Sequence, residues 1–165
     1  IPGLWSDVFD MLLDEYAELD YGDSWRLNFN YSLTDRLDQG GRRRGWKIFC
    51  HRGPGSFQCG SCRKTWPSAR VVVVFHYRLR GGRGTVIMRP FKQSCRRCPD
   101  TFQFPGFSED AVREALLKLF SKIRKNIYND DDGDGAPPDN HGRVWTKPHE
   151  TLLCEACSNG ICKQN

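Results

Sequence analysis

Ser56-Phe-Gln-Cys59-Gly-Ser-Cys62 opens the stretch of sequence that decides the fold, and Cys95-Arg-Arg-Cys98 closes it. Between these two CxxC pairs lie Val71-Val-Val-Val74 and the turn signal Gly81-Gly-Arg-Gly84. Apolar β-branched residues before and after a glycine-rich turn predict one β-hairpin. Each CxxC pair supplies two thiolates to a tetrahedral metal site, and the hairpin would bring the second pair beside the first. The stretch therefore predicts a unit like a zinc ribbon.

Cysteine spacing along the rest of the chain points the same way. The chain has 165 residues and eight cysteines, and six of these cysteines form three CxxC pairs. Repeated CxxC spacing is typical of metal knuckles and unusual in secreted disulfide frameworks, so it favours zinc and a reducing environment. The third pair lies in the tail, within a segment that also offers one imidazole and a further thiol. The candidate zinc ligands are Cys59, Cys62, Cys95, Cys98, His149, Cys154, Cys157 and Cys162.

The grouping of these ligands stays open at the level of sequence. We expect two structural zinc ions, but the third CxxC pair can instead share one ion with a pair of the ribbon. Cys50, the remaining cysteine, is expected to be a buried apolar thiol rather than a ligand. The ligand sets look closed, and the sequence contains no phosphate loop, no GxSxG motif and no deaminase pattern. These observations predict a binding module and not an enzyme.

Charge is distributed unevenly along the chain. Residues 41–99 contain fifteen Lys or Arg and no Asp or Glu, whereas residues 1–40 contain two basic and nine acidic residues. Such a block predicts a positive surface for a negative partner, which can be nucleic acid, an acidic protein segment or an anionic membrane face. The plainer alternative is a solvated basic face. The candidate binding arginines are Arg42, Arg43, Arg44, Arg78, Arg80, Arg83, Arg96 and Arg97.

Hydrophobic periodicity predicts the elements before the first CxxC pair. Residues 4–19 have the pattern of an amphipathic helix, which is expected to dock on the core or, alternatively, to pair its acidic face with the basic block. Residues 25–31 alternate apolar and polar side chains, as in a half-buried strand. Residues 32–45 read as a loop, and residues 46–50 as a strand that ends at a Gly53-Pro-Gly55 turn.

The second half of the chain predicts a connector and a further helix. Phe102, Phe104, Pro105 and Phe107 form an aromatic connector. Ser108 then has the features of an N-cap, and an apolar stripe with helical spacing continues to about Tyr128. The expected fold class is α+β: a zinc-ribbon-like antiparallel β-sheet with an N-terminal and a C-terminal amphipathic helix.

The chain is predicted to be one domain over residues 1–165, with residues 129–142 as an acidic flexible loop inside it. The loop begins like an EF-hand, but His141 stands where that site needs glutamate, so calcium binding is not expected. No run of eighteen apolar residues, no initiator Met and no signal-peptide pattern is present, so we expect a piece of a longer chain.

Three groups of residues together resemble a known family. The groups are Phe57-x-Cys59-x-x-Cys62-x3-Trp66-x-Ser68-Ala69, Val86-x-Met88-Arg89-x-Phe91-x-Gln93-x-Cys95-x-x-Cys98 and His149-x4-Cys154-Glu155-Ala156-Cys157-x2-Gly160-Ile161-Cys162. They closely resemble the triple-CxxC zinc-finger domain of receptor-transporting proteins. The two amphipathic helices and the first strand also fit, so the resemblance covers nearly all of the chain.

The resemblance implies a function in trafficking. Members of this family are intracellular, chaperone-like adaptors, tethered by a C-terminal membrane helix, that help chemosensory and other G-protein-coupled receptors to reach the cell surface. It further implies that some members are interferon-induced antiviral proteins of innate immunity that bind RNA. By the same resemblance, the zinc ligands are the cysteines of the CxxC pairs, completed by Cys162 and His149. The implied partners are receptors or other membrane proteins, RNA, and the anionic cytoplasmic membrane face, with no small-molecule substrate.

Overall fold

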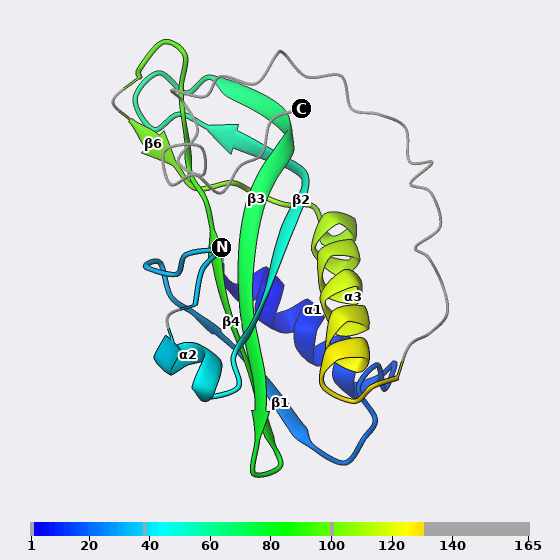
Figure 1. Ribbon diagram of the computed structural model, residues 1–165. Coiled ribbons are helices and arrows are strands. Elements are labelled where there is room, and N and C mark those ends of the chain that lie inside the picture. Colours follow the sequence, from blue (N-terminus) through cyan, green and yellow to red (C-terminus); the bar gives the residue numbers. More distant parts are fainter. Residues whose placement is uncertain (1, 38, 100, 131–165) are drawn as a thin grey trace.

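The fold combines three helices with a four-stranded and a two-stranded sheet in the computed structural model, which describes residues 2–37, 39–99 and 101–130 (Figure 1). In chain order the elements are α1 (Pro2–Asp14), β1 (Ser24–Phe29), α2 (Gln39–Arg43), β2 (Lys47–Gln58), β3 (Thr65–Arg80), β4 (Arg83–Pro90), β5 (Gln93–Ser94), β6 (Phe102–Gln103) and α3 (Glu109–Asn126). This arrangement confirms the predicted α+β class with a helix near each end of the described chain.

The hairpin predicted between the two CxxC pairs is present as β3 and β4. These strands pair antiparallel, and Gly81 and Gly82 turn the chain between them with φ values of +57° and +76°. β3 also pairs antiparallel with β2, so it lies inside the sheet of order β1-β4-β3-β2. Its sixteen residues span about 50 Å at ~3.3 Å per residue. One strand thus connects the CxxC end of the molecule to the hairpin turn (Figure 1).

Both faces of β3 are buried along the valine run, as the continuous apolar sequence predicts. Val73 and Phe75 point into the main core, whereas Val72 and Val74 belong to a smaller cluster on the opposite face with Phe91. The five residues from Val71 to Phe75 are each at most 2% exposed.

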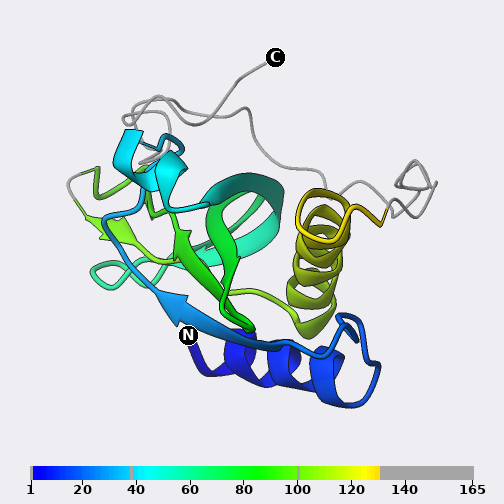
Figure 2. The same cartoon turned by 60° about the horizontal axis from the view of Figure 1, so that its bottom comes forward.

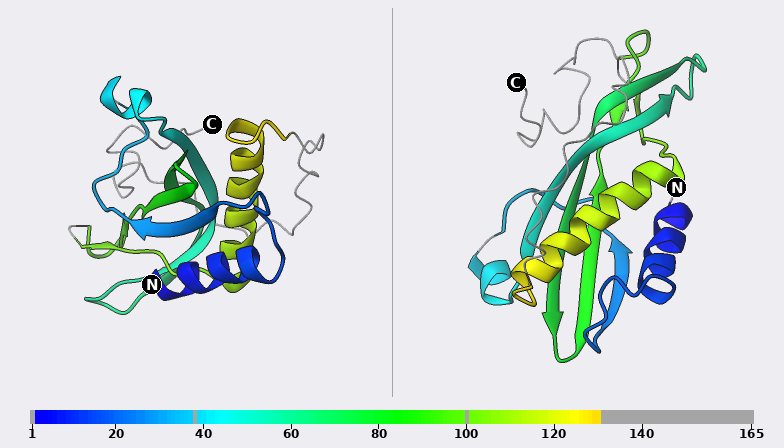
Figure 3. Two further views of the ribbon diagram at one scale, coloured as in Figure 1. Left: turned by 90° about the horizontal axis from the view of Figure 1, so that it is seen from below. Right: turned by 90° about the vertical axis from the view of Figure 1, so that its right-hand side faces the viewer.

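The two longer helices cover the main-core face of the sheet (Figures 2 and 3). α1 buries Trp5, Val8, Phe9 and Leu12 there, so it docks on the core as expected. It ends at Asp14, five residues before the predicted end, because the chain reverses at Ala17 with a φ of +49°.

The N-cap that the sequence predicts for the second long helix is present. The Ser108 hydroxyl accepts a hydrogen bond from the Ala111 N–H at 3.1 Å, immediately before α3. Glu109 and Asp110 occupy the first turn, and Arg124 and Lys125 the last, which favours the helix dipole at both ends.

The opposite face of the sheet is crossed by residues 30–46, which connect β1 to β2. The Thr34 carbonyl lies 2.7 Å from Nε2 of His76, and the Leu33 carbonyl accepts a 2.7 Å hydrogen bond from the Arg89 guanidinium. The segment was expected to be all loop, but residues 39–43 form the short helix α2. The crossing follows from the strand order, because β1 and β2 lie at opposite edges of the sheet. β1 pairs parallel to β4, while the other strand pairs of this sheet are antiparallel as expected.

The turn predicted at Gly53-Pro-Gly55 is wrong. β2 continues through these residues as one strand to Gln58, with an irregularity in its register between Gly53 and Gly55. The glycines serve close packing instead of a turn. A Cβ at residue 55 would lie 2.8 Å from a methyl group of Val71, and one at residue 53 would lie 2.7 Å from the His51 ring.

Candidate metal centre

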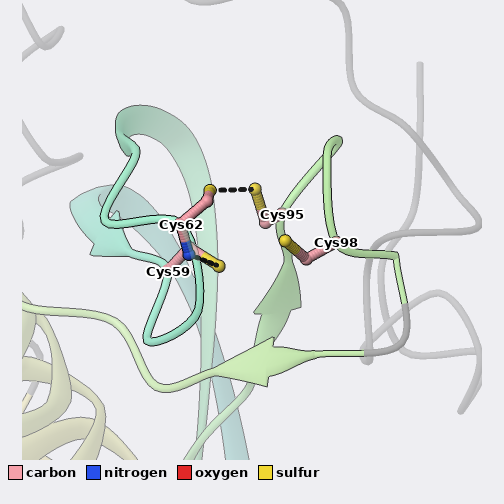
Figure 4. A group of neighbouring side chains, drawn as sticks. All are labelled: Cys59, Cys62, Cys95 and Cys98. Atoms are coloured by element: carbon pink, nitrogen blue, oxygen red, sulfur yellow. Dashed lines mark hydrogen bonds between the residues drawn. The ribbon is translucent and has the colours of Figure 1, made fainter.

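Four thiols meet at the end of the sheet opposite the turn between β3 and β4 (Figure 4). Cys59 and Cys62 lie in the turn between β2 and β3, and Cys95 and Cys98 follow β5. The four Sγ atoms all lie within 4.8 Å of one another, and the Cys62 and Cys95 sulfurs are 3.6 Å apart. The fold therefore brings together the first two CxxC pairs, as the hairpin predicts.

The first CxxC turn is shaped to present sulfur to a cation. Arg63 adopts a left-handed φ of +63°, which reverses the chain so that the Cys59 N–H reaches the Lys64 carbonyl at 2.8 Å. The N–H groups of Ser61 and Cys62 then point at the Cys59 sulfur, at 3.4 and 3.5 Å. Because these donors favour the thiolate, and the Cys62 N–H most of all, they lower the pKa of Cys59 to about 6.

A cation would favour loss of all the protons of the cluster. The hydrogen bond with the Cys59 sulfur, followed by burial, raises the pKa of Cys98 to about 12. Cys59 is thus predisposed to ionise whereas Cys98 resists ionisation, because several thiolates at this spacing repel one another. A metal ion held by these four cysteines would remove that conflict, because its positive charge would offset the repulsion between thiolates.

The cluster geometry fits zinc. Zn–S bonds of about 2.3 Å in a tetrahedron place the sulfurs roughly 3.8 Å apart, close to the 3.6 Å between Cys62 and Cys95. That separation also excludes a disulfide between these two cysteines, whose S–S bond would be about 2 Å. Four thiols fill every position of a tetrahedral ion, so a zinc ion here would be structural and would have no open position for a reacting water.

Aromatic residues beside the first CxxC pair form a small core. The rings of Phe57 and Trp66 stack with their centroids 5.3 Å apart, and the Trp66 indole N–H donates to Gln93 at 3.3 Å. Gln93 in turn donates to the Ser68 hydroxyl at 3.0 Å. These contacts tie β3 to β5, the strand that leads into the second CxxC pair, and so hold both pairs in register.

Comparison with known proteins agrees with this geometry. A family model described as a zinc-binding domain, a zinc ribbon with three CxxC motifs, matches residues 52–160. Receptor-transporting protein 4 of Homo sapiens is 30% identical over 168 residues, a match that covers 97% of this chain and 64% of that protein. The chain belongs to the family of zinc-binding domains with three CxxC motifs, and its curated relatives are receptor-transporting proteins.

Other relatives extend the match within this family. Receptor-transporting protein 3 of Mus musculus is 31% identical over 165 residues, covering 98% of this chain and 33% of that protein. Receptor-transporting protein 2 of Mus musculus is 32% identical over 148 residues, covering 84% of this chain and 62% of that protein. The chain thus spans one third to about two thirds of the length of these family members. No solved structure gives a significant match.

The remaining candidate ligands stay predictions. The third CxxC motif of the family lies beyond residue 130, so His149, Cys154, Cys157 and Cys162 are outside the described residues. Cys50 lies apart from the thiol cluster and packs against the apolar group of Val72, Val74 and Phe91. It is half-buried, whereas full burial was expected.

The candidate arginines form two groups rather than one surface. Arg78, Arg80 and Arg83 belong to the hairpin end, together with the Arg42–Arg44 segment in and after α2, while Arg96 and Arg97 lie between the cysteines of the second pair (Figure 1).

The hairpin-end group is the denser of the two. The Arg78 guanidinium lies 4.3 Å from the Trp46 ring and donates to the Arg44 carbonyl at 3.5 Å. Burial and the charges of Arg80 and Arg44 lower the pKa of Arg78 from its usual value. The fold therefore concentrates positive charge around Arg44, Arg78 and Arg80.

The structure also contains an aromatic pocket that was not predicted from the sequence. It is lined by Trp5, Phe29, Tyr31, Pro90, Phe104, Pro105 and Phe107. The residues after Thr101 were expected only to connect two elements. The sequence feature that could have indicated the pocket was the alternation of aromatic residues in this segment, whose rings are exposed.

In the described part of the chain, no helix has both the length and the apolar character needed to cross a bilayer.

Proposed function

We propose that the chain is a zinc-stabilised adaptor domain that acts on the cytoplasmic side of membranes and promotes surface delivery of G-protein-coupled receptors. The observation that carries the proposal is the similarity to receptor-transporting proteins along almost the whole chain, together with a closed four-thiol cluster. A closed site stabilises a shape and does not catalyse a reaction, so the activity has to come from the surfaces that this shape presents.

The proposal includes two zinc ions. Cys59, Cys62, Cys95 and Cys98 would hold one ion, because their four sulfurs already complete a tetrahedral set. The third motif would then bind a second ion through His149, Cys154, Cys157 and Cys162. Metal analysis of the purified chain by mass spectrometry should give two zinc per chain. A value of one would favour the arrangement in which the third motif shares the first ion.

Receptor delivery is tested in cells with the full-length protein that contains this chain. It is co-expressed with a chemosensory receptor that carries an extracellular epitope, and surface receptor is measured by flow cytometry on unpermeabilised cells. Surface receptor should rise with the wild-type protein and stay near its basal level with a Cys59→Ser/Cys95→Ser variant, because loss of the metal disorders the domain. Equal surface receptor with and without the wild-type protein would refute the trafficking role.

A second candidate function is binding of RNA, with an antiviral role, and the arginine group at the hairpin end favours it. Arg44, Arg78 and Arg80 lie close together, and no carboxylate occurs between residues 41 and 99. Binding of a single-stranded RNA should weaken as salt rises, with a slope of about −0.7 per phosphate contact. Replacing these three arginines with Gln should reduce the slope by about 2. Lys122→Gln/Lys125→Gln on exposed positions of α3 provides the control. Absence of RNA binding at low salt would exclude this function.

The same basic residues can contact the anionic face of a membrane. Co-sedimentation with vesicles that contain phosphatidylserine, compared with vesicles of phosphatidylcholine alone, separates this possibility from RNA binding.

A further inference from the structure

We propose that Cys62 is a modification site at which an anionic disulfide of low molecular weight, such as glutathione disulfide, oxidises the thiol cluster and releases its metal. Cys95 completes the reaction by forming a disulfide bond with Cys62. The inference rests on the zinc site of the proposed function and goes beyond it, because it makes that site a reversible redox switch.

The four thiols differ in their access to solvent. Cys59 and Cys95 are each 0% exposed, and Cys98 is half-buried. Cys62 is the exposed member of the set and lies in the turn that joins β2 to β3. Thiol–disulfide exchange requires direct contact between the attacking sulfur and the incoming disulfide, so access decides which thiol reacts. Cys62 is therefore the point of entry for an external disulfide.

Cys95 is placed to complete the exchange. Its sulfur lies 3.6 Å from the Cys62 sulfur, and the two thiols come from different CxxC pairs (Figure 4). A bond between them requires an approach of about 1.6 Å, because an S–S bond is about 2.0 Å long. The other candidate is Cys59, whose sulfur accepts hydrogen bonds from the N–H groups of Ser61 and Cys62 at 3.4 and 3.5 Å. These bonds hold the Cys59 sulfur within its own turn, which favours Cys95 as the second thiol.

Two exchange steps balance the reaction. The Cys62 thiolate attacks one sulfur of the external disulfide, forms a mixed disulfide and expels one thiolate of the reagent. The Cys95 thiolate then attacks the Cys62 sulfur, forms the Cys62–Cys95 bond and expels the second reagent thiolate. Two protein sulfurs are oxidised, and the external disulfide is reduced to two thiolates. The two cysteines that remain are too few to complete a tetrahedral site, so the ion is released.

Charge around the cluster selects an anionic reagent. Arg63 follows the first CxxC pair, Arg96 and Arg97 lie between the cysteines of the second, and all three arginines are exposed. With Lys64 they supply four positive charges. These charges exceed the net negative charge of a zinc ion with four thiolates, even with the carboxylate of Asp100 included. Such a surface raises the local concentration of an anionic reagent, and reactive cysteines are typically found in exposed, electropositive surroundings.

The new bond keeps the two CxxC segments connected after the metal has gone. The Gln93 amide also links β5 to Trp66 and Ser68 of β3, through contacts that involve no cysteine. The main core lies on the sheet face covered by α1 and α3 and contains none of the four thiols. Oxidation therefore alters one end of the fold without unfolding it, and a dithiol reductant with added zinc should restore the original state.

Peptide mapping of the zinc-loaded chain tests the proposal. The chain is treated with glutathione disulfide, free thiols are blocked with N-ethylmaleimide, and tryptic peptides are analysed by mass spectrometry. Trypsin leaves both cysteines of the first pair in peptide 53–63 and separates those of the second pair into peptides 93–96 and 98–113.

The expected products follow from the order of the two steps. The first glutathione adduct within the cluster should be on Cys62, located by fragmentation of peptide 53–63. The final product should join this peptide to peptide 93–96, while Cys98 is blocked by the maleimide. A first adduct on another cysteine of the cluster, or a final bond inside peptide 53–63, would refute the assignment.

Two matched variants locate the point of entry. Cys62→His and Cys59→His each leave three thiols and one imidazole, a ligand set that binds zinc. Native mass spectrometry should show that glutathione disulfide removes zinc about tenfold more slowly from Cys62→His than from Cys59→His. Equal rates would overturn the proposal. If either variant purifies without zinc, the bond mapped in the wild-type chain decides instead.

The double variant Arg63→Gly/Arg97→Gln tests the selection by charge. Glycine suits residue 63, because its φ is +63°. Oxidation by glutathione disulfide should slow by roughly threefold, whereas oxidation by cystamine, a cationic disulfide, should not slow. Lys122→Gln/Lys125→Gln on exposed positions of α3 provides the control and should react like the wild type. Equal slowing with both reagents would refute selection of an anionic disulfide.

Zinc analysis before treatment separates failure of this inference from failure of the zinc site. An untreated chain without zinc would refute the zinc site and the switch with it. Zinc that stays bound in the presence of excess glutathione disulfide would refute the switch alone. Neither result affects the receptor-delivery assay, which is measured without an added oxidant.

Discussion

Replacing Gly84 with alanine tests how β1 packs against β4 near the turn between β3 and β4. Gly84 is a buried residue of β4 that pairs with Trp25 of β1 and with Leu79 of β3. A Cβ at this position would lie 2.0 Å from Cδ2 and 2.3 Å from Cε2 of the Trp25 indole. These atoms belong to a rigid ring, so the ring itself has to move.

The cost follows from what the indole would lose by moving. Trp25 donates to the Tyr128 hydroxyl at 3.0 Å, and Tyr128 donates to Asp23 at 2.7 Å. Overpacking costs about 1–3 kcal/mol, and the lost hydrogen bond roughly 1 kcal/mol more. We expect Gly84→Ala to lower the free energy of unfolding by about 2–4 kcal/mol, and the unfolding midpoint by roughly 5–15 °C for a chain of this length.

Calorimetry and urea unfolding of the zinc-loaded chain measure this cost. Gly3→Ala provides the matched control, because a Cβ at residue 3 of α1 would meet nothing within 4 Å. Its stability should stay the same or rise slightly, since alanine favours a helix. In a Trp25→Ala background, Gly84→Ala should lose most of its effect, which gives a coupling of about 2 kcal/mol between the two sites. A loss below about 0.5 kcal/mol in the Trp25 wild-type background would refute the reasoning.

Three further predictions concern the metal, a buried histidine and a helix cap. Cys95→Ser should lower the zinc content of the chain by one ion in mass-spectrometric analysis, whereas Cys50→Ser should leave it unchanged. Burial, and then the charges of Lys118 and Arg52, lower the pKa of His51 from 6.5 to about 4. Since only the unfolded chain binds this proton between those values, stability should fall by roughly 3 kcal/mol as the pH falls from 6.5 to 4. Urea unfolding across that range should show a flatter dependence for His51→Gln, and an unchanged slope would contradict the assignment. Ser108→Ala should cost about 1 kcal/mol by removing the N-cap bond, while Ser121→Ala on the exposed side of α3 should cost nothing measurable by calorimetry.

Local patterns predicted the elements that depend on local chemistry. The valines of β3, the glycines that end it and the Ser108 cap each have a physical cause within a few residues, and each was predicted correctly. The meeting of the first two CxxC pairs was also predictable, because the two strands of one hairpin separate them by a fixed register.

Features that depend on distant contacts were not predictable in this way. Gly53 and Gly55 look like a turn, yet their lack of side chains serves packing against His51 and Val71 inside β2. The parallel pairing of β1 with β4 has no local signal, since it depends on burial of Trp25 in the main core beside Tyr128. The division of the arginines between two ends of the molecule likewise depends on the length of the strands, which charge counting does not reveal.

The parallel pairing of β1 also sets an order for folding. Ser24 pairs with Arg83, so β1 finds its neighbour only across 58 intervening residues, whereas Arg80 and Arg83 meet across a two-residue turn. Closing the longer loop costs more chain entropy before any contact compensates for it. We therefore expect the hairpin to form first and β1 to add to its free edge afterwards. During synthesis, α1 and β1 leave the ribosome before β4 has been made. Until β4 is available for pairing, we expect Trp25 and the apolar face of α1 to stay exposed to other proteins.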